Sequence, residues 1–267
     1  MKASILSFDL DNTLLDHRTW CIPDTALACI QELRERFRIV LATGRNMDDV
    51  LSLPYKELLA PDAIVHLNGG RVSLRQSLSP LRYSDLFQFP MDSALLAELL
   101  SFARSNGLCL GMHEGDADYF SHPDILRQID LRRFGESCRN FVSPDALCKL
   151  PVYSLTLFGS APDFSLLQKA FPQISVLSFA NGYMADLTPK GNSKASALQA
   201  LAHYWKEDLA SVIAFGDDRN DLELLQAAGI GIAMGNASEE VKAAADYVTA
   251  PIHEDGIQKA CRHFQLC

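Results

Sequence analysis

The first third of the chain alternates short apolar runs with amphipathic segments, and this alternation restricts the folds it can adopt. Apolar runs at residues 5–8, 38–42 and 63–67 each end abruptly in polar or glycine residues, and segments with helical spacing, 24–37 and 47–53, lie between them. Strand, helix, strand, helix, strand is the order of a parallel sheet covered by helices. We therefore predict an α/β protein with a parallel-sheet core.

The alternation of strands and helices stops in the middle of the chain and resumes near its end. Residues 71–83 predict a hairpin, 93–104 an amphipathic helix, and the stretch to about 183 mixes short strands with helical segments. The parallel pattern resumes with helices at 193–205, 221–228 and 238–245 and strands at 211–215 and 231–234. We predict a core made of residues 1–81 and 185–267, interrupted by an inserted α+β domain at 82–184.

The composition and charge of the chain limit what it can bind and where it can reside. The chain has 267 residues, 48% of them hydrophobic, and a formal net charge of -9, which is typical of a globular protein and argues against nucleic-acid or anionic-membrane partners. Seven scattered cysteines without a C-x-x-C pair indicate reduced thiols, several of them in the core. No apolar stretch approaches the ~20 residues of a membrane span, and the first apolar run is too short for a signal peptide. We predict a cytoplasmic protein; the sequence leaves monomer and homodimer open.

Two carboxylates follow the first predicted strand, in the pattern Asp9-x-Asp11-x-Thr13. Ligands of α/β sheets bind where parallel strands end, and Mg²⁺ prefers oxygen ligands of this kind. One carboxylate could attack phosphorus, and the second could exchange a proton with the leaving oxygen and with water. The simpler alternative is a pair of acids that cap the following turn.

A second acidic group, at residues 216–221, follows the strand predicted at 211–215. Asp217 could reach a metal ion held by Asp9, and Asp221, one helical turn further on, could point the same way. The alternative is a helix N-terminus that is enriched in acids for electrostatic reasons alone.

Two further turns carry groups that suit a phosphate. Thr43 and Gly44 follow the second strand and offer a hydroxyl and backbone N–H groups, although a plain glycine turn is the alternative. Lys194 lies at a helix start, where it could clamp a phosphoryl group among the acids or be one more solvated lysine. Four separate turns thus supply acids, a hydroxyl, amides and a lysine, which is the inventory of metal-assisted phosphoryl transfer.

These motifs resemble those of the haloacid dehalogenase superfamily. The resemblance rests on four segments, at residues 8–15, 42–45, 194 and 216–221. Residues 68–70 before the insertion, and 224–229, 233–237 and 241–246 near the end, are similar to its Cof-type branch, whose Rossmann-like core carries a large α/β cap between the second and third motifs. The resemblance covers both core segments, and it covers the cap in placement and rough pattern.

The resemblance implies a role for each site residue. Asp9 would be the nucleophile and a metal ligand, and Asp11 would be the general acid and base and would offer its backbone carbonyl to Mg²⁺. Asp217 would be the main remaining metal ligand. The supporting residues would be Asp221 at the metal, Thr43, Gly44 and Lys194 at the phosphate, and Asn68, Gly69 and Asn220 beside them.

Two positions depart from the family pattern. Asn12 stands where glycine is usual, and asparagine is the next residue most able to adopt left-handed geometry, so we expect the turn to survive. Ala195 follows the lysine where glycine is usual. We assign Lys194 rather than Lys190 as the functional lysine, because its register before Ala197 fits the family.

The prediction is a Mg²⁺-dependent phosphatase of a small, sugar-phosphate-like metabolite that forms an aspartyl-phosphate on Asp9. A phosphomutase or phosphotransferase on the same core is the first alternative, distinguished by whether water alone accepts the phosphoryl group. A non-catalytic binding module is the second, and the presence of every acid and the lysine argues against it. The inserted domain should select the substrate.

Overall fold

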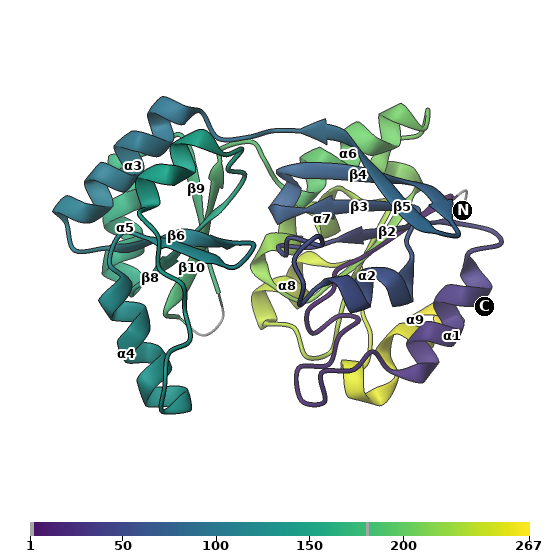
Figure 1. Cartoon of the computed structure of the whole chain (residues 1–267). Helices are drawn as coiled ribbons and strands as arrows, with labels where there is room; N and C mark the ends of the chain where they lie inside the picture. The colour runs from purple at the N-terminus through teal and green to yellow at the C-terminus, as the bar shows by residue number, and fades with distance from the viewer. Residues whose placement is uncertain (1–2, 180–181) are drawn as a thin grey trace. The chain divides into compact units, whose positions relative to one another are not determined.

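The computed structural model describes residues 3–179 and 182–267, which form two compact units (Figure 1). The first comprises the described residues of Met1–Gln88 together with Asn192–Cys267, and the second is Phe89–Gly191. The predicted boundaries, 82 and 184, fall too early at both ends. Residues 82–88 pair with the preceding strand in the first unit, and residues 184–189 form a strand of the second unit.

The first unit contains an eight-stranded sheet. Its strand order is β13-β12-β11-β1-β2-β3-β4-β5, parallel from β13 to β3 and antiparallel from β3 to β5. The parallel-sheet core is therefore confirmed, with an antiparallel hairpin added at one edge. The strands are β1 (Ile5–Phe8), β2 (Arg38–Ala42), β3 (Ala63–His66), β4 (Arg71–Leu78), β5 (Leu81–Gln88), β11 (Val212–Gly216), β12 (Ile230–Ala233) and β13 (Tyr247–Val248).

Helices cover both faces of this sheet, because successive strand side chains point to opposite faces. Leu6 and Phe8 of β1 pack in one hydrophobic cluster, whereas Ile5 packs in the other. The first cluster includes side chains from α1 (Asp24–Leu33), α2 (Leu53–Leu59) and α9 (Gly256–His263). The second includes side chains from α6 (Lys194–Tyr204), α7 (Leu222–Ala227) and α8 (Glu239–Ala244).

One predicted helix is displaced along the chain. The spacing at 47–53 predicts a helix there, but α2 begins at Leu53. The Asn46 and Asp49 side chains accept hydrogen bonds from backbone N–H groups two residues on, at 3.1 and 2.9 Å, which holds the segment in turns. Pro54 then starts the helix, as proline does well in a first turn.

The second unit has an antiparallel five-stranded sheet in the order β7-β6-β8-β10-β9. Helices α3 and α5 pack with it in one hydrophobic cluster, and Leu126 of α4 packs with Cys109 and Phe120 in another. This is the expected α+β composition. The elements are α3 (Ser93–Ser105), β6 (Cys109–Glu114), β7 (Ala117–Phe120), α4 (Pro123–Phe134), β8 (Leu155–Phe158), α5 (Ala161–Ala170), β9 (Ile174–Ser178) and β10 (Met184–Pro189).

Across residues 3–179 and 182–267, no helix has both the length and the apolar character that crossing a membrane requires.

Candidate active site

The candidate site lies where the central parallel strands of the first unit end. Phe8 of β1 is in register with Phe215 of β11 on one side and with Leu41 of β2 on the other. Asp9 therefore lies between Asp217 and Thr43, which directly follow β11 and β2. The Asp9 N–H donates to the Phe215 carbonyl at 3.0 Å, which continues the ladder to the site itself.

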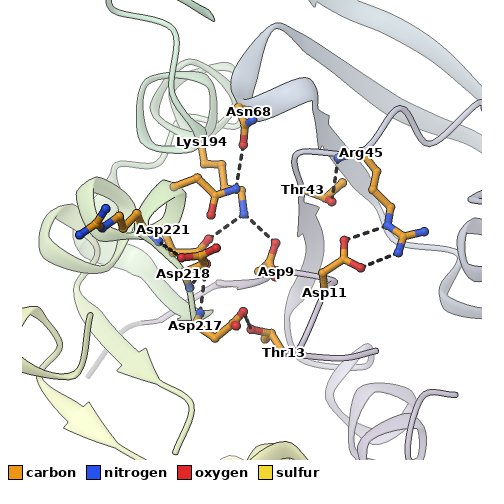
Figure 2. A network of polar contacts seen from close by, with 12 residues as sticks. Asp9, Asp11, Thr13, Thr43, Arg45, Asn68, Lys194, Asp217, Asp218 and Asp221 are labelled. Atoms are coloured by element: carbon orange, nitrogen blue, oxygen red, sulfur yellow. Dashed lines mark hydrogen bonds and ion pairs between the residues drawn. The ribbon is translucent and has the colours of Figure 1, made fainter. Parts of the chain in front are cut away.

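Lys194 joins two carboxylates at the centre of the site (Figure 2). Its Nζ donates to Asp9 Oδ1 at 2.6 Å and to Asp221 Oδ1 at 2.8 Å. Lys194 is 1% exposed and Asp9 is 6% exposed, so water screens these ion pairs weakly. Lys190, the alternative functional lysine, is exposed and belongs to the second unit.

The position of Lys194 is set by the start of α6. Ser193 caps the helix and accepts a hydrogen bond from the Ser196 N–H. Gly69 lies against this cap with φ of +96°, and a Cβ at position 69 would stand 2.1 Å from the Ser193 carbonyl oxygen. The loop after β3 can approach α6 this closely because residue 69 is glycine.

Asp221 is bound through both of its oxygens. Besides the contact to Lys194, its Oδ2 accepts hydrogen bonds from the backbone N–H groups of Asp217 and Asp218 at 3.1 and 3.3 Å. These bonds hold the turn after β11 (Figure 2). Asp217 is oriented in turn by Thr13, whose hydroxyl donates to Asp217 Oδ1 at 3.0 Å. The two acidic motifs are thus directly hydrogen-bonded to each other.

Carboxylate oxygens of Asp9, Asp217 and Asp221 all lie within 4.8 Å of one another. Burial, together with the charges of neighbouring acids, raises the pKa of Asp9 and that of Asp217 above the ordinary range, although Lys194 opposes the effect at Asp9. Burial alone would lower the pKa of Lys194, but Asp221 and Asp9 outweigh it and raise that pKa. One ammonium is too little positive charge for three clustered carboxylates, of which Asp9 and Asp221 are buried and Asp217 is half-buried, so the cluster favours an additional cation.

The Asp11 carboxylate is bound differently from the other acids. Arg45 donates to it from Nε at 2.8 Å and from Nη2 at 2.5 Å, and His17 Nε2 lies 2.6 Å from its Oδ1. Burial would raise the pKa of Asp11, but the hydrogen bonds with His17 and Arg45 outweigh burial and lower the pKa to about 2. In this arrangement Asp11 is an ionised carboxylate.

The predicted phosphate-binding residues gather beside the acids. The Thr43 hydroxyl accepts a hydrogen bond from the Arg45 N–H at 3.1 Å, and a Cβ on Gly44 would stand 3.2 Å from Asn68 Oδ1. Asn68 is 1% exposed and accepts a hydrogen bond from Asn220 Nδ2 at 2.8 Å. Residues from the loops after β2, β3 and β11 therefore lie in contact with one another.

Asn12 adopts left-handed geometry, with φ of +57°, so the expected turn is present. The structure brings Asp9, Asp217, Asp221 and Lys194 together, as the motifs predicted. Sequence reasoning missed the contacts of Thr13, His17 and Arg45. Thr13 and Arg45 lie within the motif segments 8–15 and 42–45, so their position is a usable signal, whereas nothing in the sequence singles out His17.

A model of the haloacid dehalogenase-like hydrolases matches residues 6–261. The chain belongs to this family. A Haemophilus influenzae relative, described only as a candidate phosphatase, is 44% identical over 263 residues, and the match covers 93% of each chain. The 5-amino-6-(5-phospho-D-ribitylamino)uracil phosphatase YitU of Bacillus subtilis is 29% identical, and the match covers 98% of each chain.

Solved structures in the family have the same fold. The structure of the subclass IIB sugar phosphatase BT4131 superposes with a TM-score of 0.85 and 26% identity, covering 99% of this chain and 100% of its own. The high TM-score over nearly both full lengths confirms the α/β core with a second antiparallel sheet. Together with the family match, it identifies this haloacid dehalogenase-like hydrolase as an enzyme of the phosphatase type.

Proposed function

We propose that the protein is a Mg²⁺-dependent phosphatase that hydrolyses a small, sugar-phosphate-like monoester through an aspartyl-phosphate on Asp9. The observation that carries this proposal is the placement of Asp9. It is buried at the end of a central strand, bound to Lys194 at 2.6 Å, and clustered with Asp217 and Asp221. A carboxylate in such a setting can act as a nucleophile toward phosphorus.

The donor set fits Mg²⁺. Three carboxylates within 4.8 Å of one another offer hard oxygen ligands and carry more negative charge than Lys194 balances. We assign the carboxylates of Asp9 and Asp217 and the backbone carbonyl of Asp11 as ligands. Asp221, whose two oxygens are used by Lys194 and by two backbone N–H groups, would hold the turn and the lysine in place. Bound Mg²⁺ would supply positive charge against the transferring phosphoryl group.

The reaction has two displacements at phosphorus. In the first, an Asp9 oxygen forms a bond to phosphorus, the bond from phosphorus to the ester oxygen breaks, and that oxygen takes a proton from Asp11. In the second, water attacks phosphorus, the bond to Asp9 breaks, and the water proton passes to Asp11. Lys194 would stabilise the negative charge on the phosphoryl oxygens in both transition states.

Asp11 must change its surroundings to serve as the acid. While Arg45 and His17 hold it, its pKa of about 2 keeps it ionised at neutral pH. We propose that substrate binding draws Asp11 away from Arg45, so that it can take up a proton. The Arg45-bound form would then be a resting state in which the acid is withheld.

The remaining polar residues would bind the phosphate group. Thr43, Gly44 and Asn68 lie together, and Asn220 is hydrogen-bonded to Asn68 at 2.8 Å. A threonine hydroxyl, backbone N–H groups and amide side chains can donate to phosphoryl oxygens while Lys194 supplies the charge.

The substrate class rests on the relatives. One relative acts on a phosphorylated ribityl compound and another is a sugar phosphatase, so a phosphorylated polyol or sugar is the first class to test. We propose that the inserted unit, Phe89–Gly191, selects among such substrates. It has its own hydrophobic core and interrupts the catalytic unit at a single site in the sequence.

The decisive experiment is a phosphate-release screen of phosphate esters with and without Mg²⁺, with Asp9→Asn as the matched control. We expect Mg²⁺-dependent release by the wild type and none above background by the variant. Equal activity in the two proteins would refute the covalent mechanism. Turnover only after addition of a second sugar phosphate would instead indicate a phosphomutase or phosphotransferase.

A further inference from the structure

Three cysteines from distant parts of the chain lie close together in the first unit. They form a group separate from the acidic cluster of Asp9, Asp217 and Asp221. Cys29 belongs to α1, Cys261 belongs to α9, and Cys267 follows α9. Their Sγ atoms all lie within 4.8 Å of one another, and those of Cys29 and Cys267 are 3.7 Å apart. Phosphoryl transfer at Asp9 has no use for these thiols.

We propose that these thiols form a binding site for a thiophilic metal ion, with Zn²⁺ as the natural candidate. Thiolate sulfur binds zinc at about 2.3 Å, so two sulfurs on a tetrahedral zinc ion are about 3.8 Å apart. The observed 3.7 Å between Cys29 and Cys267 corresponds to this spacing, whereas a disulfide bond requires about 2.05 Å. Cys29 and Cys267 are therefore spaced for a shared ion, and the Cys261 Sγ lies within 4.8 Å of both.

The third thiol is held in place by the end of α9. The Gln265 N–H donates to the Arg262 carbonyl and the Leu266 N–H donates to the Cys261 carbonyl, at 3.1 and 2.8 Å. Gln265 has φ of +55°, so this is a Schellman turn, and it folds the chain back over the helix. Arg36 fixes the turn by donating from Nη1 to the Leu266 carbonyl at 2.7 Å. Cys267 is thus positioned before any ion binds.

The surroundings suit a soft cation with one open position. Cys29 is 3% exposed and Cys261 is 0% exposed, and both belong to a hydrophobic cluster, whereas Cys267 is partly exposed. Three protein sulfurs with access to solvent at Cys267 leave a fourth coordination position for water. Each thiol that binds the ion loses its proton to solvent, so binding of one Zn²⁺ should release about three protons.

The test is a Cd²⁺ and Zn²⁺ titration of the fully reduced, full-length protein, with excess Mg²⁺ present to fill oxygen sites. We expect one equivalent of Cd²⁺ to produce ultraviolet sulfur-to-metal charge-transfer absorption, which carboxylate ligands do not produce. Cys267→Ser should weaken this binding by at least about tenfold. Cys148→Ser, which changes an exposed cysteine, should bind as the wild type does.

Two further measurements keep the proposal testable if a variant folds poorly. Zn²⁺ binding to the wild type should release about three protons and should raise the melting temperature, because the ion binds the folded state. Absence of the charge-transfer band, release of less than one proton, or unchanged binding in Cys267→Ser would overturn the proposal.

Discussion

Arg45 donates hydrogen bonds to both oxygens of the Asp11 carboxylate, from Nε to Oδ2 at 2.8 Å and from Nη2 to Oδ1 at 2.5 Å. A guanidinium that binds a carboxylate through two parallel hydrogen bonds forms one of the strongest polar contacts in proteins. The residue proposed to move protons is therefore held in the state in which it cannot donate one. In the proposed mechanism, the contact between Arg45 and Asp11 has to break in each catalytic cycle.

Replacing Arg45 by methionine should raise the pKa of Asp11 by about 1–2 units, because the hydrogen bonds and charge that lower it are lost. Substrate binding is proposed to separate the two residues, so this shift belongs to the substrate-free protein. The measurement is an NMR titration of the Asp11 side-chain carboxyl carbon in the absence of substrate. Arg18→Met, which removes a partner of Asp16 instead, should leave the Asp11 titration in place, and an unshifted Asp11 titration in Arg45→Met would count against the proposed role.

Lys194→Met should reduce phosphate release by about 10²–10³-fold, because the group proposed to stabilise the transition-state charge is removed. Without Mg²⁺, the variant should also be destabilised more at pH 8 than at pH 5, since buried Asp9 loses its cation beside Asp221 and protonation of Asp9, whose pKa is raised by burial, relieves the repulsion. Activity and melting temperature at both pH values test this. Lys190→Met, at an exposed position, should match the wild type.

Asp217→Asn should raise the Mg²⁺ concentration needed for half-maximal activity by about 10–100-fold, because a proposed charged ligand becomes neutral. The amide can still accept the hydrogen bond from Thr13, so the turn should be preserved. The measurement is a Mg²⁺ titration of phosphate release. Asp218→Asn is the matched control, since Asp218 caps the next turn through Arg219, and an equal change in both variants would refute the assignment.

Gly69→Ala should lower both stability and kcat. The new Cβ would meet the Ser193 carbonyl and displace the start of α6, which carries Lys194. Gly107→Ala separates this clash from backbone strain, because Gly107 also has positive φ but an added Cβ has open space. The control should lose about 1–2 kcal/mol from strain alone and keep full kcat. Denaturant unfolding and steady-state kinetics measure both effects.

His66 should make the protein sensitive to mild acid. Burial lowers its pKa from 6.5 to about 3, so between these values the unfolded chain takes up a proton that the folded protein does not. The free energy of unfolding therefore falls by about 1.4 kcal/mol for each pH unit below 6.5 because of this group. His66→Gln should remove this contribution, so the gap in unfolding free energy between variant and wild type should change with pH. A gap that is constant from pH 7 to pH 4 would contradict the prediction.

The parts of the fold that the sequence predicts well are those with strong local signals. The apolar runs of β1, β2 and β3 end in the polar residues Asp9, Thr43 and Asn68, and parallel neighbours carry such residues to one edge. The sheet therefore predicts the site as well as the fold. The register between Phe8 and Phe215 then places the second acidic motif beside the first.

The parts that sequence reasoning missed depend on tertiary contacts. β5 contains many polar residues, and its extent to Gln88 is set by pairing with β4, so the domain boundary could not be read locally. The orientation of Asp11 depends on Arg45 and His17: Arg45 lies in a motif segment, but which carboxylate it binds follows only from the fold, and nothing in the sequence singles out His17. Likewise, Cys29 and Cys267 are 238 positions apart, and their proximity follows only from the packing of α1 with α9.

The sequence distances across the site also bear on how the enzyme is made. The contact from Lys194 to Asp9 spans 185 positions and that from Thr13 to Asp217 spans 204. Contacts between such distant segments form slowly, because a long loop must close first. During synthesis, most of the chain, including the whole of Phe89–Gly191, must therefore be made before Asp9 can contact Lys194. Catalytic activity should be the last property that the growing protein acquires.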